Sequence, residues 1–163
     1  KYPYTPVKGW KYQGNPKDVE KSVKILKKSK QALIYVGSGV FSSNACNELF
    51  RFVELAQVPV LTTLKGKSVF PENHQLSLGV RGEPANKFLI KADLIFCLGV
   101  GFTPSNFQHV IPDSTNKKII QCTIDESDLN CEYSIDHAII GDITLILMIL
   151  IFESENEGVP NPG

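Results

Sequence analysis

The chain has 163 residues, of which 42% are hydrophobic and 21% are charged, and it carries no net charge at pH 7. This length suits a single domain, and this composition excludes wholesale disorder because enough apolar surface is available to form a core. The neutral balance disfavours a dominant role in binding nucleic acid or an anionic membrane.

The charges are distributed unevenly along the chain. Residues 1–30 hold nine lysines and two acids, whereas residues 121–163 hold nine acids and neither Lys nor Arg. This pattern is typical of two solvated faces at opposite ends of a domain. The alternative interpretation is that these segments dock onto neighbouring chains or domains of opposite charge.

The predicted elements begin with a helix at Asn15-Pro16, where Asn is a favourable N-cap and Pro a favourable first residue. Helical periodicity also covers residues 43–56 and 84–91, and the apolar run 143–152 predicts a buried closing helix. That run is too short for a membrane span, which needs about 20 residues. Short apolar strands are predicted at residues 32–36, 58–62, 94–98, 118–124 and 137–140.

The alternation of strands and helices predicts an α/β fold. Each strand is a near-continuous apolar run, which is typical of a parallel sheet with helices on both faces. We therefore expect a three-layer, doubly wound, mainly parallel sheet of about six strands, which is Rossmann-like. Residues 16–152 would form this domain, with residues 1–15 as a linker and residues 153–163 as a linker or tail, because both ends are polar and contain Pro and Gly.

Cysteine usage favours a reducing compartment. No pair has C-x-x-C spacing, and two of the four cysteines lie inside apolar strand-like runs, which indicates reduced core thiols in a cytosolic protein. The three histidines are too scattered to suggest a zinc site. The cysteines are Cys46, Cys97, Cys122 and Cys131.

Four of the expected strands end in small or acidic residues, where parallel sheets of this type bind ligands. Glycines at these ends allow tight turns and the close approach of a ligand, and the backbone N–H groups after Gly37 could hold a phosphate at the start of a helix. The alternative is that the glycines make tight turns with no ligand. The strand ends read Gly37-Ser38-Gly39, Gly99-Val100-Gly101, Thr123-Ile124-Asp125 and Gly141-Asp142.

Two other Rossmann-like functions are disfavoured. A nicotinamide dinucleotide site would place an acid about 20 residues after the glycines, where this chain has Thr62 and Thr63. A deacylase of the sirtuin type would need a catalytic histidine and a zinc-binding cysteine quartet, and neither His109 nor His137 has that context. His74 lies in a loop with no nucleophile or acid beside it in sequence, so we expect it to make structural hydrogen bonds and not to act as a general base.

The stretch 58–79 carries Thr63, Gly66, Lys67, Pro71, His74 and Gly79. It resembles the central domain of thiamine-diphosphate-dependent enzymes, the family of acetolactate synthase, pyruvate oxidase and oxalyl-CoA decarboxylase. In that family the second strand runs into a T-x-x-G-K-G-x-x-P-x-x-H-P-x-x-x-G-like stretch. Ser68 replaces the family's usual Gly, and Gln75 replaces its usual Pro.

Further segments agree with this family in order and spacing over roughly residues 16–152. The resemblance implies the DHS-like NAD/FAD-binding fold and a three-domain parent. In that parent, flanking pyrimidine- and diphosphate-binding domains of the same chain hold thiamine diphosphate and Mg²⁺. The agreeing segments are the glycine triplet 37–39, Ala92-Asp93-Leu94, the turn 99–102, Ile124-Asp125 and Gly141-Asp142.

The resemblance also implies a function. The chain would be the excised central domain of an acetolactate-synthase-like enzyme acting on 2-keto acids or acyl-CoA derivatives, with a cytoplasmic and homo-oligomeric parent. No catalytic residue and no metal ligand is assigned, because Gly141-Asp142 is followed by Ile143 where the family's metal signature has a second Gly. The domain alone would therefore be inactive.

In relatives, this domain binds FAD, binds ADP or has only a structural role. A nucleotide position carried over by motif would place the first glycine triplet along the diphosphate or ribose. The turn 99–101 would pass beneath the ribose, and Asp142 would accept a hydrogen bond from the adenine amine. The implied cofactor-binding residues are Gly37, Ser38, Gly39, Thr63, Leu64, Gly99, Val100, Gly101, Thr123, Ile124 and Asp142.

One departure from the family favours a structural role over a filled FAD site. FAD-binding members usually carry an Arg in the turn that corresponds to residues 99–104 of this chain, where a guanidinium pairs with the diphosphate. The turn 99–104 contains no Arg, and Arg81 is the candidate substitute.

Overall fold

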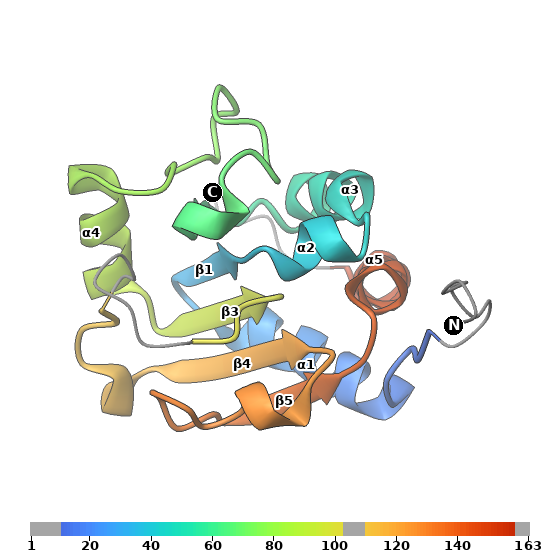
Figure 1. The fold of residues 1–163 in the computed structure, drawn as a ribbon. Helices are drawn as coiled ribbons and strands as arrows, with labels where there is room; N and C mark the ends of the chain where they lie inside the picture. The colour runs from blue at the N-terminus through green and yellow to red at the C-terminus, as the bar shows by residue number, and fades with distance from the viewer. Residues whose placement is uncertain (1–10, 103–109, 159–163) are drawn as a thin grey trace, which may run out of the picture.

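The computed structural model describes residues 11–102 and 110–158. Helices and strands alternate along this part of the chain (Figure 1). In order, the elements are α1 (Pro16–Lys28), β1 (Ala32–Val36), α2 (Gly39–Ser42), α3 (Cys46–Ala56), β2 (Val60–Thr62), η1 (Leu64–Gly66), α4 (Glu83–Lys91), β3 (Leu94–Leu98), η2 (Ser114–Asn116), β4 (Lys118–Thr123), η3 (Glu126–Asp128), β5 (His137–Ile140) and α5 (Ile143–Glu157).

The strands of the described sheet are all parallel and follow the order β2-β1-β3-β4-β5. The predicted parallel α/β fold is confirmed, with five strands where about six were expected. Every residue of β3 is buried, which explains its continuous apolar run. The strand order reverses between β1 and β3, which is the position where such sheets form a crevice at their carboxyl edge.

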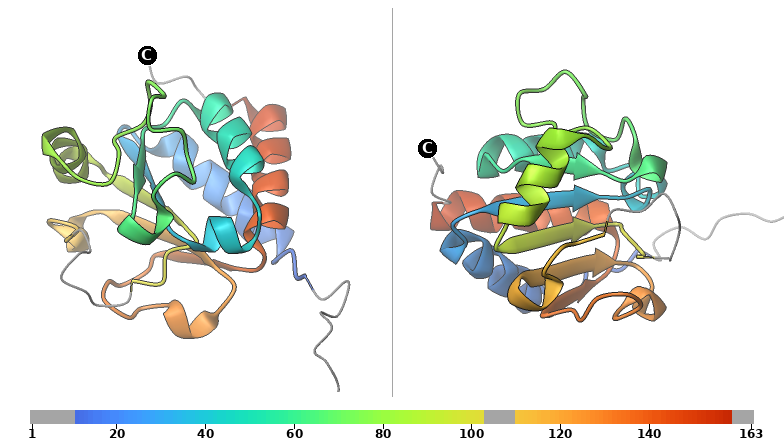
Figure 2. Two further views of the ribbon diagram at one scale, coloured as in Figure 1. Left: turned by 45° about the horizontal axis from the view of Figure 1, so that its top comes forward. Right: turned by 90° about the vertical axis from the view of Figure 1, so that its left-hand side faces the viewer.

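One face of the sheet, here called the helical face, is covered by α1, α3 and α5, which lie side by side (Figure 2). Alternate strand residues such as Ile34 and Phe96 point into this layer and form one large hydrophobic core with the helices. Phe52 of α3 is fully buried, and its ring centroid lies 6.1 Å from that of Phe96.

The opposite face, here called the loop face, is covered by α4 and by the loops that follow β3 and β4. Leu89 of α4 packs there beside Phe102 and Tyr133, which belong to the two loops. The rings of Phe102 and Tyr133 are 5.1 Å apart, and the Tyr133 hydroxyl accepts a hydrogen bond from the Ile111 N–H at 3.0 Å. This core therefore depends on aromatic side chains from irregular segments.

The first helix confirms its predicted start, whereas the predicted helix over residues 43–56 differs at its beginning. The Asn15 side chain caps α1 by accepting a hydrogen bond from the Lys17 N–H at 3.1 Å. In the second region a single turn, α2, is followed by Asn44 with a φ of +58°, and α3 begins only at Cys46. A left-handed residue interrupts helical geometry, and Asn tolerates that conformation better than most residues.

The ends of the domain also differ from the expected boundaries. Helix α5 continues to Glu157, so residues 153–157 are helical where a linker or tail was expected. Polar residues are compatible with an exposed helix, and α5 ends at the left-handed Gly158, which has a φ of +59°. At the other end, Tyr12 O accepts a hydrogen bond from the Asp142 N–H at 2.7 Å, so part of the expected linker contacts the domain. Residues 1–10 and 159–163 of these linkers lie outside the described residues. So do residues 103–104 of the turn 99–104, and His109. No helix in the described part of the chain is long and apolar enough to cross a membrane.

Candidate functional site

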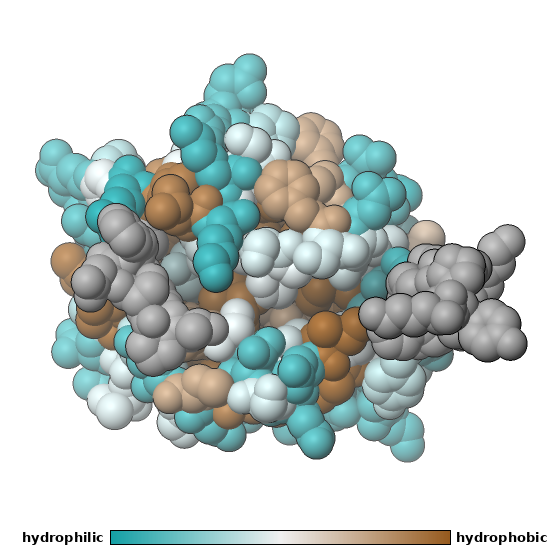
Figure 3. Space-filling model, viewed as in Figure 1, coloured by the Kyte–Doolittle hydropathy of each residue, from teal (hydrophilic) through white to brown (hydrophobic). Residues whose placement is uncertain are grey.

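A groove of about 800 Å³ lies at the carboxyl ends of the strands. It is bounded by α2, η1, the turn after β3, the ends of β4 and β5, and the start of α5. Figure 3 shows hydrophobic surface in the middle of this face, framed by more polar residues. The groove wall contains all the site residues expected from the resemblance: Gly37, Ser38, Gly39, Thr63, Leu64, Gly99, Val100, Gly101, Thr123, Ile124 and Asp142.

Three glycines hold the loops after β1 and β3 in direct backbone contact. A Cβ on Gly37 would lie 2.2 Å from the carbonyl oxygen of Gly99, and a Cβ on Gly39 would lie 2.6 Å from the Gly99 Cα. Gly99 itself has a φ of +63°, which L side chains rarely adopt. The Cβ positions of these glycines are thus occupied by the facing loop. Close packing between the two loops therefore requires glycine at these positions.

The backbone N–H groups around the first triplet are also engaged. The Gly37 N–H donates to Leu98 O at 3.0 Å, the Gly39 N–H donates to Gly99 O at 3.1 Å, and the Val40 N–H donates to Gly37 O at 3.4 Å. The helix that follows, α2, has only four residues. Of the N–H groups after Gly37 that were expected to be able to hold a phosphate, those of Gly39 and Val40 therefore already have backbone partners.

The segment after β2 forms the roof of the groove. The Thr63 hydroxyl caps η1 by accepting a hydrogen bond from the Gly66 N–H at 3.0 Å. A Cβ on Gly66 would lie 2.8 Å from Val36 O, so this turn is pressed onto the end of β1. Leu64 stays 53% exposed and presents apolar surface beside the groove.

The turn after β3 is held by side chains of the loop face. Val100 O accepts a hydrogen bond from the Gln121 side-chain amide at 2.8 Å, and that amide also donates to Asp128 O at 3.1 Å. Phe102 adopts a φ of +48° and is almost fully buried. No arginine occurs in the groove wall among the described residues, and Arg81 does not reach it.

At the ends of β4 and β5 the polar groups already have partners within the chain. The Thr123 hydroxyl donates to Asp128 Oδ2 at 2.7 Å, and Ile124 is 62% exposed at the rim. The Oδ1 atom of Asp142 caps α5 by accepting from the Thr144 N–H at 3.1 Å, and its Oδ2 atom lies 3.1 Å from Lys11 Nζ. The buried Asp142 carboxylate thus has a structural role that its motif did not predict.

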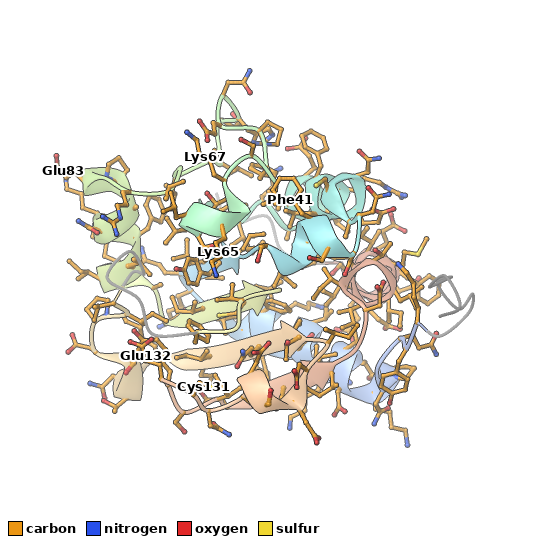
Figure 4. The ribbon with its side chains drawn as sticks, in the orientation of Figure 1. Phe41, Lys65, Lys67, Glu83, Cys131 and Glu132 are labelled. Carbon is orange, nitrogen blue, oxygen red and sulfur yellow. The ribbon has the colours of Figure 1, made fainter. Side chains whose placement is uncertain are left out.

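Three charged residues of the groove wall were missed by the sequence analysis: Lys11, Lys65 and Asp128. Lys65 follows Leu64 directly and lies near the middle of this face, below η1 (Figure 4). It forms no ion pair with the described residues. The position of Lys65 inside the family stretch was an available signal. Lys11 and Asp128 had none, because distant segments bring them to the groove.

His74 lies outside the groove and makes structural contacts, as expected. Its Nε2 atom is 3.0 Å from Glu54 Oε1, and its Nδ1 atom accepts from the Leu76 N–H at 3.2 Å. Its ring lies edge-on to Phe70 and Phe50, at 4.9 and 5.5 Å between centroids. Both ring nitrogens are engaged, so His74 fastens its loop to α3.

The four cysteines differ in burial. Cys97 and Cys122 are buried free thiols, and burial raises the pKa of both. Cys46 is half-buried and Cys131 is exposed, so the expectation of core thiols holds for the first pair only. A thiol with a raised pKa is a poor nucleophile, which argues against chemistry at the buried pair.

The described residues do not fit thiamine diphosphate or Mg²⁺. They contain no group of His, Cys, Asp and Glu side chains that could hold a metal ion. Gly141-Asp142 is followed by Ile143, and the Asp142 carboxylate is committed to Lys11 and the start of α5.

A family comparison defines the class of protein. The model described as "Thiamine pyrophosphate enzyme, central domain" matches residues 19–150. This match covers most of the chain, so the chain belongs to this family, and the resemblance stated from the sequence is confirmed. The alternative of an unrelated Rossmann-like enzyme is wrong.

Within this family, the chain is similar to proteins named as acetolactate synthase large subunits. The chain is 37% identical over 142 residues to the "Probable acetolactate synthase large subunit" of Methanococcus aeolicus, covering 85% of this chain and 24% of that protein. It is 35% identical over 154 residues to the "Acetolactate synthase large subunit" of Buchnera aphidicola subsp. Schizaphis graminum, covering 89% and 26%. The chain therefore spans about a quarter of the length of these relatives.

The fold is similar to that of a solved structure. The benzoylformate decarboxylase from Polynucleobacter necessarius aligns with a TM-score of 0.74 and 21% identity, covering 93% of this chain and 29% of that one. At this identity the likeness concerns the fold alone. It agrees with the parallel α/β architecture described above.

Proposed function

We propose that this chain is the structural central domain of an acetolactate-synthase-like enzyme and carries no catalytic residue. The observation that supports this most directly is the central-domain match over residues 19–150, together with relatives named as acetolactate synthase large subunits. Family membership implies thiamine diphosphate for the parent, and that cofactor supplies carbanion chemistry when bound. Flanking domains of the same chain would hold it with Mg²⁺.

The state of the groove supports a structural role. Its carboxylates are engaged by Thr123, Lys11 and the start of α5, so none is poised as a general base beside a nucleophile. Its glycines serve the contact between two loops. The domain would therefore support the parent's architecture, while the reaction on 2-keto acids or acyl-CoA derivatives takes place at sites built by its neighbours.

The test compares this chain with the complete parent. Each is mixed with pyruvate, thiamine diphosphate and Mg²⁺, and both pyruvate consumption and acetolactate formation are followed. We expect turnover by the parent and none by the 163-residue chain. Turnover by the isolated chain would refute the structural role, and a parent that forms no acetolactate would refute the acetolactate-synthase assignment.

A second candidate function is binding of FAD or ADP. It is supported by the groove volume of about 800 Å³, which lies within the usual range for ligand sites, and by the gathering of all the motif-derived residues in its wall. The ammonium group of Lys65 could pair with a phosphate in place of the family's arginine. The exposed apolar surface of Leu64 and Ile124 would suit an aromatic ring system.

Calorimetric titration with FAD and with ADP tests this candidate. A dissociation constant weaker than about 1 mM, equivalent to about 4 kcal/mol, would exclude it. If a nucleotide binds, Lys65→Met should weaken binding by about tenfold, since a charge-assisted contact contributes on that order. Lys67→Met is the matched control, because Lys67 lies two residues away, outside the groove wall, and should leave affinity unchanged.

The parent would be a cytoplasmic homo-oligomer. Buried free thiols at Cys97 and Cys122 are compatible with a reducing compartment. Sedimentation of the complete parent would test its oligomeric state.

A further inference from the structure

A second pocket, of about 350 Å³, lies at the amino ends of the strands, at the edge of the sheet opposite to the groove. It is here called the amino-edge pocket. Its wall is formed by the end of α1, the start of β1, the segments before and after β2, and the second half of α4, which stands in front in the right view of Figure 2. None of the residues in this wall lines the groove. Any function of the amino-edge pocket is therefore separate from those considered for the groove.

Apolar side chains make up most of the wall of the amino-edge pocket. Leu26 and Val58 contribute buried side chains, and Leu76 contributes a half-buried one. Phe88 of α4 is 42% exposed although its neighbour Leu89 is buried, so this aromatic side chain is available to a ligand. The volume lies near the lower limit for ligand sites, which are mostly apolar with a few polar groups.

Polar contacts hold the wall in place without a ligand. The Asp93 carboxylate accepts hydrogen bonds from the loop 29–31, including those from the N–H groups of Lys30 at 2.8 Å and of Gln31 at 3.1 Å. On another side, Lys117 Nζ donates at 2.8 Å to two carbonyl groups at the end of α4. The pocket is therefore largely preformed, which lowers the entropic cost of binding.

The charges of the amino-edge pocket favour an anion. Lys30 and Lys91 are the only charged residues in its described wall, and neither forms an ion pair with the described residues. The C-terminal ends of α1, α3 and α4 also meet this wall, each equivalent to about half a negative charge. In each helix, however, the N–H of the capping residue already donates to a carbonyl of the last turn, and the ammonium group of Lys117 lies at the end of α4. The two lysines are thus the strongest charges that a ligand would meet.

The same contacts disfavour a phosphate as the anion. Phosphate sites normally use free backbone N–H groups or the guanidinium of an arginine. Here the N–H groups of Lys30 and Gln31 are taken by Asp93, and the described wall contains no arginine. A carboxylate suits this wall better, because it can pair with a single ammonium group.

We propose that the amino-edge pocket is a binding site for a small apolar carboxylate. The hydrocarbon part of the ligand lies against Leu76 and Phe88, and its carboxylate pairs with Lys30 or Lys91 at the rim. Binding is favoured by removal of apolar surface from water, while the ion pair selects the charged head group. The proposal goes beyond the proposed function and does not depend on it.

NMR titration of the 15N-labelled chain with hexanoate tests this site. We expect saturable shifts at the backbone amides of Ser29, Gln57 and Ala92, with a dissociation constant of about 1 mM, and no shifts at Gly37 and Gly99 of the groove. Hexanamide has the same shape without the charge and should bind about fivefold more weakly, as expected for loss of an exposed ion pair. Acetate keeps the charge but lacks four methylene groups, and should bind at least about tenfold more weakly.

Variants separate the contribution of the charge from that of the apolar wall. Lys30→Gln combined with Lys91→Gln should lower the affinity for hexanoate to that for hexanamide. The matched control is Lys17→Gln combined with Lys21→Gln, which removes the same charge from exposed positions of α1 outside the wall and should leave affinity unchanged. Phe88→Ala should weaken binding of hexanoate and hexanamide by the same factor, because both lose the same apolar contact.

Three results would overturn the proposal. The first is the absence of saturable shifts up to about 20 mM hexanoate. The second is equal affinity for hexanoate and hexanamide, because the lysines would then play no part. The third is a set of shifts confined to the groove, which would place the ligand there. Acetolactate formation by the parent and titration with FAD or ADP are separate measurements, so failure of this proposal is distinguishable from failure of the proposed function.

Discussion

The helical face and the loop face of the same sheet are built from different kinds of contact. The helical face joins α1, α3 and α5 through mostly aliphatic side chains that recur at helical spacing, with Phe52 packed among them. The loop face has α4 alone among the described helices and fills its remaining core with Phe102, Tyr133 and the amide of Gln121. The first face therefore contributes most of the hydrophobic core, whereas the second positions the loops that form the groove.

The largest effect on stability is expected in the core of the helical face. Phe52→Ala should lower the free energy of unfolding by about 4 kcal/mol, because it removes a fully buried ring and leaves a cavity. Urea denaturation measures the change. Phe152→Ala, at an exposed ring of α5, should cost under about 1 kcal/mol. Equal costs would contradict the assignment of the core to the inner side of the helices.

The contact between the two glycine loops should show the next largest effect. Gly37→Ala places a Cβ 2.2 Å from Gly99 O, so backbone must move, and we expect a loss of about 3 kcal/mol. Gly79→Ala is the control, since its Cβ meets nothing within 4 Å and only the φ of +68° opposes it, at a cost of about 1 kcal/mol. If Gly37→Ala were the milder change, the loops would not be packed as described.

The hydrogen bonds that the Gln121 side chain makes on the loop face should contribute less to the free energy of unfolding. Gln121→Leu removes the amide that donates to Val100 O and Asp128 O, and it leaves two carbonyl groups without this partner. We expect a loss of about 2 kcal/mol in the free energy of unfolding. Gln31→Leu, at an exposed position, should change stability by under about 0.5 kcal/mol. A neutral Gln121→Leu variant would show that this amide does not hold the turn.

A small gain in stability is expected where the sequence departs from the family. Ser68 stands at the family's usual Gly and adopts a φ of +70°, which costs a non-glycine residue about 1 kcal/mol. Ser68→Gly should therefore raise the free energy of unfolding by about 0.5 kcal/mol, after the added flexibility of the unfolded chain is subtracted, and this gain appears as a higher midpoint of urea denaturation. A lower midpoint would mean that the Ser68 side chain makes a stabilising contact.

The smallest effect concerns acid stability at the opposite edge of the sheet. Burial alone would raise the pKa of Asp93, but hydrogen bonds from the Ser29 hydroxyl and the N–H groups of Lys30 and Gln31 outweigh it and lower the pKa below 3.8. A lowered pKa in the folded state contributes stability above the unfolded value, and this contribution is lost as pH falls through the folded value. Asp93→Asn should therefore flatten the decline in denaturation midpoint between about pH 5 and pH 2. An equally steep decline in this variant would contradict the assignment.

Much of the architecture could be predicted because its signals are local. Asn15-Pro16 marked the start of α1, and the apolar run at residues 94–98 marked a strand buried on both sides. The break at Asn44 was missed because helical periodicity on either side hides a single left-handed residue. The sequence predicts too short a helix at α5 because residues 153–157 are polar, although polar residues are compatible with a solvated helical turn.

The family motif predicted which residues line the groove, but not the contacts that these residues make. The residues that the family pattern identified lie together in one groove, but their partners could not be read from it. Lys11 reaches Asp142 from a segment expected to be a linker, and Asp128 reaches Thr123 from the loop before β5. Such pairings depend on how the loops cross in space, which no local pattern encodes.

By itself the amino-acid order determined the alternation of helices and strands, the parallel sheet and membership of the thiamine pyrophosphate enzyme family, because periodicity, turn residues and motif spacing are properties of neighbouring positions. Only the tertiary structure decided that the backbones of Gly37 and Gly99 are in direct contact, and that one side of α5 is exposed to solvent. Both outcomes depend on distances between segments far apart in the chain, and those distances arise only when the whole domain packs.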